Sequence, residues 1–270
     1  RVKFDKTEET KTLILPLIRE KIPLFILVLV ACAMTILTQT HSGSIAPLSE
    51  SSLKFRAILV PLGYTFYLGK FIWPVGLSAI YPVEKFLAVG NATVAFVVLG
   101  ALSVELVRHY KTRPYLAVGW FWFLGTLVPV IGFVQVGSVH VADRFSYIPL
   151  IGLSIPIAWG LADLIAARPG LKKPVCALAG LAVVAWVTLT LIQLPHWKNG
   201  VTLLSRTVAV TENNWRGHNN LGRAYEVRGK LDQALEQYRK TVEINPRYAI
   251  GRNNLGNILK ALGRHEEAQE

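Results

Sequence analysis

Charged residues are scarce in this sequence. Asp, Glu, Lys and Arg together account for 17% of the 270 residues, against 52% for the hydrophobic types, and the mean hydropathy is +0.39. The apolar residues stand in continuous blocks instead of recurring at the spacing of one helix face. This pattern excludes an ordinary soluble domain and indicates a protein that crosses the membrane several times.

Cysteine is also rare. The two cysteines, Cys32 and Cys176, both lie inside apolar blocks, which argues against a disulfide framework and a thiolate metal site. His41 and His109 have no partner at metal-ligand spacing, so no metal site and no other cofactor is expected. The formal net charge is +12, but the basic residues fall mainly between the apolar blocks, as membrane topology requires. A nucleic-acid partner is therefore not expected.

The chain is organised around residues 115–153. An uncharged apolar run at 115–134 has the length of roughly 20 residues that a helix needs to cross the hydrocarbon layer of a bilayer. A polar connection at 135–146 and a second apolar run at 147–167 complete a helical hairpin with charge at its tip. Outside the hairpin, a polar flank is predicted at 1–21, and the transmembrane domain at 22–194 has further spans at 22–38, 86–107 and 174–194.

The apolar block at 55–73 is ambiguous, because Pro61, Gly63 and Gly69 interrupt it. It is a re-entrant helix, an interfacial helix or an additional span. If it does not cross, twelve Lys and Arg residues lie on one side of the membrane and five lie near it on the other; if it crosses, the counts are nine and eight. Because basic residues accumulate on the cytoplasmic side, five spans are favoured. The C-terminal domain is then non-cytoplasmic, in the periplasm of a bacterium or the ER lumen of a eukaryote.

After Leu194 the sequence becomes polar and repeats itself. The motif NNLG at 219–222 returns at 253–256, a period of 34 residues. This is the period of the tetratricopeptide repeat (TPR), a pair of antiparallel helices that stack on their neighbours. We expect a TPR domain at 195–270, with one full repeat at 215–248, a truncated repeat at 249–270 and a helix of a degenerate earlier repeat at 201–211. The predicted fold class is all-α, a multi-pass transmembrane helix bundle followed by a TPR α-solenoid.

Two groups of polar residues are candidates for binding. On the repeats, hydrogen-bonding side chains are expected along the concave surface, where they would bind an extended polypeptide: Asn219, Asn220, Arg223, Asn253 and Asn254. At the hairpin tip, ionisable residues directly follow a span, a place where such residues are often functional. These are Asp143 and Arg144, with His140 and Tyr147 beside them.

Two interpretations of the hairpin tip stay open. In one, Asp143 and Arg144 lie in water, Arg144 meets lipid phosphate and Tyr147 is an interfacial anchor. In the other, Arg144 and His140 contact the phosphate of a lipid-linked substrate, while Asp143 orients Arg144 or a sugar hydroxyl.

Several stretches resemble a known family. They are similar to the transmembrane and tetratricopeptide-repeat protein O-mannosyltransferases and their bacterial relatives. The stretches are KFIWPVGLSAIYP at 70–82, RPYLAVGWFWFLGTLVPVIGFVQVG at 113–137, ADRFSYIPLIG at 142–152 and the repeat opening HNNLG at 218–222. The resemblance implies a GT-C-type glycosyltransferase that takes a sugar, with mannose as a candidate, from a polyprenyl-phosphate donor on the non-cytoplasmic face. The repeats would present the acceptor protein.

The sequence departs from this family in its acidic residues. GT-C enzymes carry the catalytic acidic residue in the first non-cytoplasmic loop of their N-terminal half, and this chain is expected to begin after that half. Glu50 and Glu84 stand alone, so no general base is assigned and the 270 residues are predicted to be catalytically incomplete. A non-enzymatic, membrane-anchored TPR scaffold remains the alternative. An O-antigen polymerase or ligase and a transporter are less favoured, because arginine-rich loops and repeated spans are missing from the sequence.

Overall fold

The computed structural model describes residues 53–82, 89–132 and 140–269, together with residues 16, 19–23, 26, 27, 29, 30, 33, 34, 37 and 38. The chain divides into two compact units, Arg1–Pro47 and Leu48–Glu270. The described residues of the first unit are all helical and exposed. The span predicted at 22–38 lies partly outside the described residues and stays a prediction.

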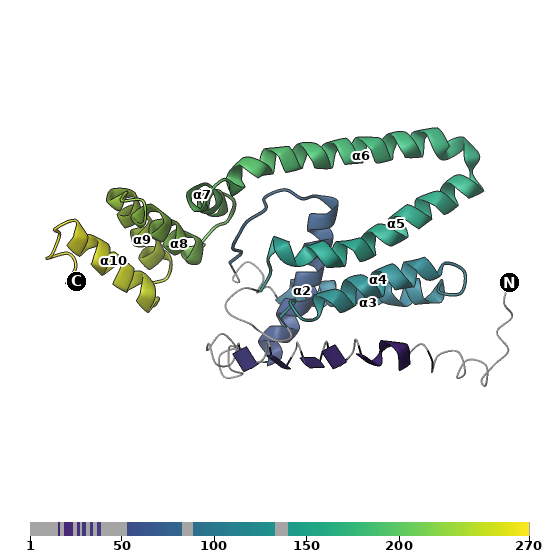
Figure 1. Cartoon of the computed structure of the whole chain (residues 1–270), viewed down its shortest axis with the longest axis horizontal. Helices are drawn as coiled ribbons and strands as arrows, with labels where there is room; N and C mark the ends of the chain where they lie inside the picture. The colour runs from purple at the N-terminus through teal and green to yellow at the C-terminus, as the bar shows by residue number, and fades with distance from the viewer. Residues whose placement is uncertain are drawn as a thin grey trace. The chain divides into compact units, whose positions relative to one another are not determined.

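The unit Leu48–Glu270 is built from helices, and its described residues contain no strand. The all-α prediction is therefore confirmed. Its apolar part consists of α2 (Leu53–Ile72), α3 (Val89–Arg108), α4 (Pro114–Leu127), α5 (Tyr147–Ala167) and α6 (Lys172–Gln193) (Figure 1). Short 3₁₀ turns stand at the ends of α5 and α6: η2 (Asp143–Ser146), η3 (Pro169–Leu171) and η4 (Leu194–Trp197). Four more helices follow, α7 (Gly200–Val210), α8 (Trp215–Glu226), α9 (Leu231–Ile244) and α10 (Ala249–Ala261).

Within the described residues, three helical segments are long and apolar enough to cross a membrane, judged by length and composition. They are Gly90–Arg108, Asp143–Ala167 and Pro169–Trp197. These segments overlap the spans predicted at 86–107, 147–167 and 174–194. The structure describes every residue of α6, and none of them is buried. Such an apolar surface fits a lipid environment better than water.

The helix predicted at 115–134 is shorter than expected. α4 ends at Leu127 after 14 residues, or about 21 Å at the usual rise of an α-helix, less than the ~30 Å of the hydrocarbon layer. Pro129 has no N–H to continue the ladder, and an irregular turn leads to Gly132, which has a φ of +106°. Whether this segment crosses the membrane stays a prediction.

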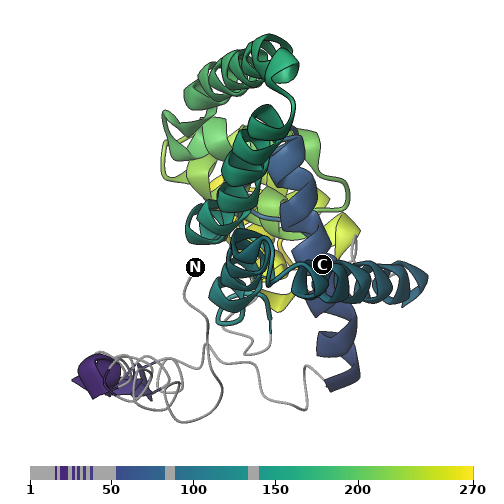
Figure 2. The ribbon, with the colours of Figure 1, turned by 90° about the vertical axis from the view of Figure 1, so that its right-hand side faces the viewer.

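The ambiguous block at 55–73 forms one continuous helix, α2, that passes through Pro61 without a break. It is not among the three segments of membrane-crossing length and composition. α2 stands upright in both views of Figures 1 and 2, while α5 and α6 run across its direction. The Tyr64 hydroxyl donates to the carbonyl oxygen of Leu124 at 2.8 Å, so one face of α2 is held against α4.

A cluster of buried side chains joins α2, α3, α4 and α5, to which α6 contributes no buried residue. Phe123 and Leu127 of α4 are fully buried at its centre. The other buried members come from α2, α3, α4, α5 and the loops between them: Val60, Tyr64, Tyr67, Tyr81, Leu99, Trp120, Ile131, Val141 and Leu153. Most of these residues are large and apolar, so their burial provides the main stabilisation of the cluster.

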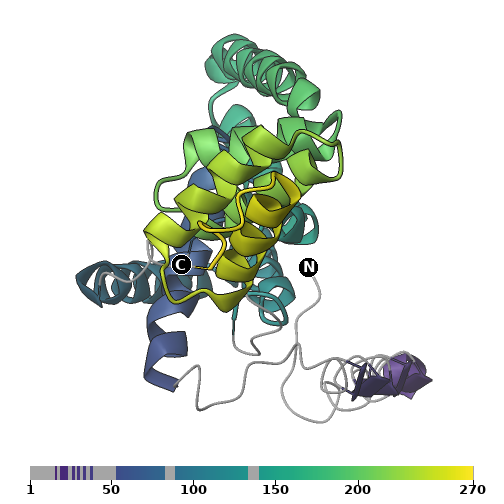
Figure 3. The ribbon, with the colours of Figure 1, turned by 90° about the vertical axis from the view of Figure 1, so that its left-hand side faces the viewer.

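The C-terminal helices pack as a repeat solenoid, with α7 against α8, α8 against α9 and α9 against α10, and Figure 3 shows them stacked at the C-terminal end. α8 and α9 are the two helices of the repeat predicted at 215–248. A Cβ on Gly222 of α8 would stand 2.7 Å from the Tyr238 ring, so the small residue permits the close approach. α10 begins the repeat predicted at 249–270, but residues 262–269 form turns.

Glycine also brings α4 and α5 together. A Cβ on Gly152 would stand 2.6 Å from the Gly119 carbonyl oxygen and 2.9 Å from the Phe123 amide nitrogen, whereas a Cβ on Gly160 of the same helix would meet nothing within 4 Å. We predict that Gly152→Ala lowers the free energy of unfolding by about 1–3 kcal/mol, because the backbone atoms cannot move aside easily. Thermal unfolding in detergent measures this, and Gly160→Ala is the matched control. Equal melting temperatures for the two variants would contradict the packing.

Candidate functional site

The carboxylate of Asp143 contacts the loop at residues 73–82 that follows α2. It accepts hydrogen bonds from the Ser78 backbone N–H at 3.1 Å and from the Tyr81 hydroxyl at 2.9 and 3.1 Å. Burial raises the pKa of the Tyr81 phenol, and the nearby Asp143 charge raises it further. Tyr81 therefore stays protonated at neutral pH and remains a donor to the carboxylate.

The hairpin tip is also fixed to α2 through Tyr67. The Tyr67 hydroxyl donates to the Ala142 carbonyl oxygen at 3.1 Å and accepts from the Ala142 N–H at 3.0 Å. Both residues are only 1% exposed. The bond to the Ala142 N–H satisfies a backbone donor that would otherwise be costly to bury. The Ala142 carbonyl oxygen also accepts from the Phe145 N–H at 2.9 Å.

The other side of loop 73–82 is held by the repeats. Asn214, which is 1% exposed, donates from its amide nitrogen to the Ile80 carbonyl oxygen at 2.9 Å. The Ala79 N–H donates to the hydroxyl of the buried Thr207 at 3.3 Å. Asn214 also caps α8, because its side-chain oxygen accepts from the Gly217 N–H at 2.9 Å. One asparagine thus starts the repeat helix and attaches it to the loop.

A cavity of about 400 Å³ lies beside Asp143. Loop 73–82, the tip of the hairpin and the end of α6 form its walls. The lining residues are Pro74, Leu77, Asp143, Tyr147, Leu189, Thr190, Gln193, Leu194 and Trp197. It is a mainly apolar cavity with a carboxylate in its wall, at the junction of the apolar helices and the repeats.

The structure separates the four residues predicted at the hairpin tip. Asp143 and Tyr147 line the cavity, whereas His140 is buried with its ring centroid 5.9 Å from that of Phe55. Arg144 is exposed, and its guanidinium lies 5.0 Å from the Phe145 ring centroid. The carboxylate of Asp143 is bonded to loop 73–82 instead of forming an ion pair with Arg144. The expectation that Asp143 orients Arg144 is therefore not supported by this geometry.

Sequence reasoning did not single out Ser78 and Tyr81 as partners of Asp143. Both lie in the stretch KFIWPVGLSAIYP at 70–82, which carried part of the family resemblance. That stretch was the available signal, but it did not indicate which residues face the hairpin tip.

The predicted polypeptide-binding residues fall into two groups. Asn219 is buried and accepts a hydrogen bond from the Asn254 amide at 2.9 Å, so these two side chains link α8 to α10. Asn220 and Arg223 line a cavity of about 370 Å³ together with Gly200, Ala224, Val227 and Arg228. Asn253 is exposed. Binding by Asn220, Arg223 and Asn253 stays a prediction, and Asn219 and Asn254 have a structural contact.

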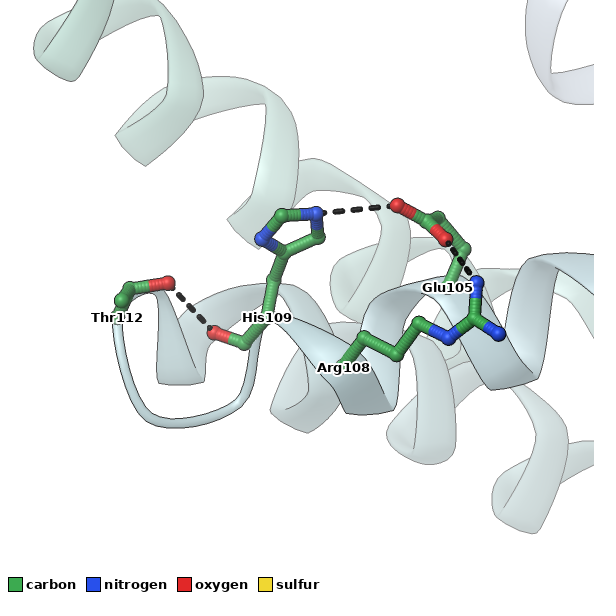
Figure 4. Close-up of polar contacts among 4 residues, drawn as sticks. All are labelled: Glu105, Arg108, His109 and Thr112. Atoms are coloured by element: carbon green, nitrogen blue, oxygen red, sulfur yellow. Dashed lines mark hydrogen bonds and ion pairs between the residues drawn. The ribbon is translucent and has the colours of Figure 1, made fainter.

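Histidines and acidic residues do not gather into a metal-binding group in the described part of the chain. His109 lies near the end of α3, where its Nε2 is 3.0 Å from a Glu105 carboxylate oxygen (Figure 4). The other oxygen of Glu105 is 3.3 Å from the Arg108 guanidinium. This carboxylate is therefore surrounded by local basic partners within one helix turn.

The attachment of the repeats to loop 73–82 can be tested at Asn214. Asn214→Asp keeps the oxygen that caps α8 but removes the amide that donates to the Ile80 carbonyl oxygen and to the Thr211 hydroxyl. We predict that amide hydrogen exchange in loop 73–82 becomes about tenfold faster, because the loop loses an attachment to the repeats, although the Ile80 carbonyl keeps the Ser78 hydroxyl as a donor at 2.9 Å. Hydrogen exchange with mass spectrometry measures this, with the exposed Asn253→Asp as control. Unchanged exchange in the loop would show that Asn214 does not hold it.

Comparisons with known proteins agree with the resemblance. Residues 222–263 match a family model described as TPR repeat. The chain is 29% identical over 211 residues to protein O-mannosyl-transferase TMTC3 of Mus musculus, an alignment that covers 73% of this chain and 21% of that protein. It is 29% identical over 198 residues to TMTC1 of Mus musculus, covering 70% and 20%, and 28% identical over 183 residues to Tmtc3 of Drosophila melanogaster, covering 65% and 19%.

The chain spans about one fifth of the length of these relatives. The similarity, the apolar helices of membrane-crossing length and the C-terminal repeat together indicate a membrane protein. The comparisons thus confirm the resemblance of this chain to the transmembrane and tetratricopeptide-repeat protein O-mannosyltransferases over nearly three quarters of its length.

Proposed function

We propose that this chain is part of a membrane glycosyltransferase of the GT-C type. It transfers a sugar, with mannose as the candidate, from a polyprenyl-phosphate donor to protein acceptors. The observation that carries the proposal is the similarity over 73% of the chain to a protein named an O-mannosyl-transferase. The apolar helices anchor the chain in the bilayer, where a donor with a polyprenyl chain also resides.

The position of the Asp143 cavity supports this proposal. It lies between the end of α6, a candidate membrane span, and the loop to which Asn214 and Thr207 attach the repeats. A donor held in the bilayer and a polypeptide held by the repeats would meet near this junction. For the polypeptide, Asn220, Arg223 and Asn253 supply exposed donors and acceptors.

The non-enzymatic scaffold is the second candidate. It is favoured by one observation: the Asp143 carboxylate is held by Ser78 and Tyr81 in contacts that serve the fold. A residue used in this way is a poor general base, which must reach an acceptor hydroxyl directly. The catalytic residue is therefore not assigned, and the 270 residues alone are expected to give no sugar transfer.

A transfer assay separates the two candidates. Membranes from cells that carry the whole gene in which this chain is encoded are expected to transfer labelled sugar from the polyprenyl-phosphate donor to protein, and membranes from cells lacking the gene are not. We predict that Arg144→Ala lowers the transfer at least tenfold without changing membrane insertion, because a guanidinium that binds phosphate is lost. Arg168→Ala, at the opposite end of α5, is the matched control. Full transfer by Arg144→Ala would remove Arg144 from donor binding, and equal transfer without the gene would favour the scaffold.

The proposal also places the TPR domain on the non-cytoplasmic side. We predict that a protease added to the non-cytoplasmic face of sealed vesicles cuts the chain beyond Leu194, because the repeats lie in that compartment. Immunoblotting of the fragments measures this. A control site of known orientation on another membrane protein checks that the vesicles are sealed. Cleavage beyond Leu194 only from the cytoplasmic face would reverse the orientation.

A further inference from the structure

The cavity beside Asp143 presents hydrogen-bond acceptors in an apolar wall. Leu77, Leu189 and Leu194 supply apolar surface from the loop and from the end of the α6 segment. Among the lining residues, all of which the structure describes, none is Lys, Arg or His. The one charged group in the wall is the Asp143 carboxylate.

The carboxylate of Asp143 has room for further donors. It accepts from two groups, the Ser78 N–H and the Tyr81 hydroxyl, whereas a carboxylate offers about four lone-pair sites. The Thr190 hydroxyl donates to the Trp186 carbonyl oxygen at 2.8 Å within α6, which leaves its lone pairs as acceptors. A ligand that fits these two groups must donate hydrogen bonds.

A phosphate does not meet this requirement. It is an acceptor with negative charge, so it cannot donate to Asp143 or Thr190. Lys70, the cation whose charge acts on Asp143, is not among the lining residues, and its ammonium donates to the carbonyl oxygens of Val75 and Gly76. Sugar hydroxyls meet the requirement for donors, because each can donate one hydrogen bond and accept others. The apolar walls and the membrane-length helix beside them suit an attached hydrocarbon chain.

We propose that this cavity binds the hydroxyl-bearing sugar of a lipid-linked ligand, with the hydrocarbon chain against α6 and any phosphate outside the wall. The inference rests on the proposed function for the identity of the lipid-linked sugar. It deepens that function by assigning Asp143 and Thr190 to the sugar hydroxyls and by excluding the phosphate from this cavity.

Binding of simple amphiphiles to the full chain in phosphatidylcholine nanodiscs tests the proposal. The probes are decyl mannoside, decyl phosphate and 1-decanoylglycerol, and the signal is the change in tryptophan fluorescence that disappears in Trp197→Phe. We expect saturable binding of decyl mannoside and at least tenfold weaker binding of decyl phosphate. Tighter binding of decyl phosphate, or no difference, would overturn the proposal.

Substitutions check that the signal comes from this cavity. Asp143→Asn should weaken decyl mannoside binding at least tenfold, because hydrogen bonds to a charged group are lost, while Asp163→Asn near the other end of α5 should not. Leu189→Trp should block binding by filling the cavity, and Leu191→Trp, at an exposed position outside the wall, is its control. If Asp143→Asn fails to fold, the Leu189 pair still decides. Binding unchanged in Leu189→Trp would overturn the assignment.

The remaining outcomes separate this inference from the proposed function. If the chain binds decyl mannoside but sugar transfer does not depend on its gene, the assignment of the cavity stands and the proposal of a transferase is refuted. Gene-dependent transfer without decyl mannoside binding would refute the cavity alone. Binding of 1-decanoylglycerol as tight as that of decyl mannoside would overturn the assignment to a sugar, because a glycerol head group of a bilayer lipid would then be the occupant.

Discussion

The hydrogen bonds on the two sides of loop 73–82 are the constraint on which the arrangement of Leu48–Glu270 depends. Asp143 holds the loop from the hairpin tip, and Asn214 and Thr207 hold it from the repeats. Ser78, Asn214 and Thr207 are all buried. A hydrogen bond contributes about 0.5–1.5 kcal/mol net, so each bond favours one placement of the loop over its alternatives.

This constraint links the cavity to the repeats. Pro74 and Leu77 of the loop line one wall of the cavity, and Asp143 lines another. The residues that attach the repeats, Ala79 and Ile80, follow only a few positions later in the same loop. A movement of the repeats against the apolar helices would therefore move a wall of the cavity. In a transferase, such a connection would keep an acceptor on the repeats in register with a donor in the bilayer.

Close packing in both parts of this unit uses glycine. Gly119 and Gly152 let α4 and α5 approach in the apolar part, and Gly222 lets α8 approach the Tyr238 ring in the repeats. Small residues favour helix contacts in a membrane because lipid gives little hydrophobic driving force there. In the repeats, burial of Tyr238, Ala234 and Ile258 adds the hydrophobic contribution that water provides.

The sequence by itself determined the helical class, the apolar segments of membrane-crossing length and the repeat at 215–248. These features depend on local periodicity, since hydropathy over about 20 residues and a period of 34 residues can be read along the chain. Only the tertiary structure decided that α4 ends at Leu127 and that Asp143 faces Tyr81, 62 residues away, instead of Arg144. It also decided that Asn214 bonds to Ile80, 134 residues earlier. Such pairings depend on which chain segments approach one another in the fold, and no local pattern encodes that approach.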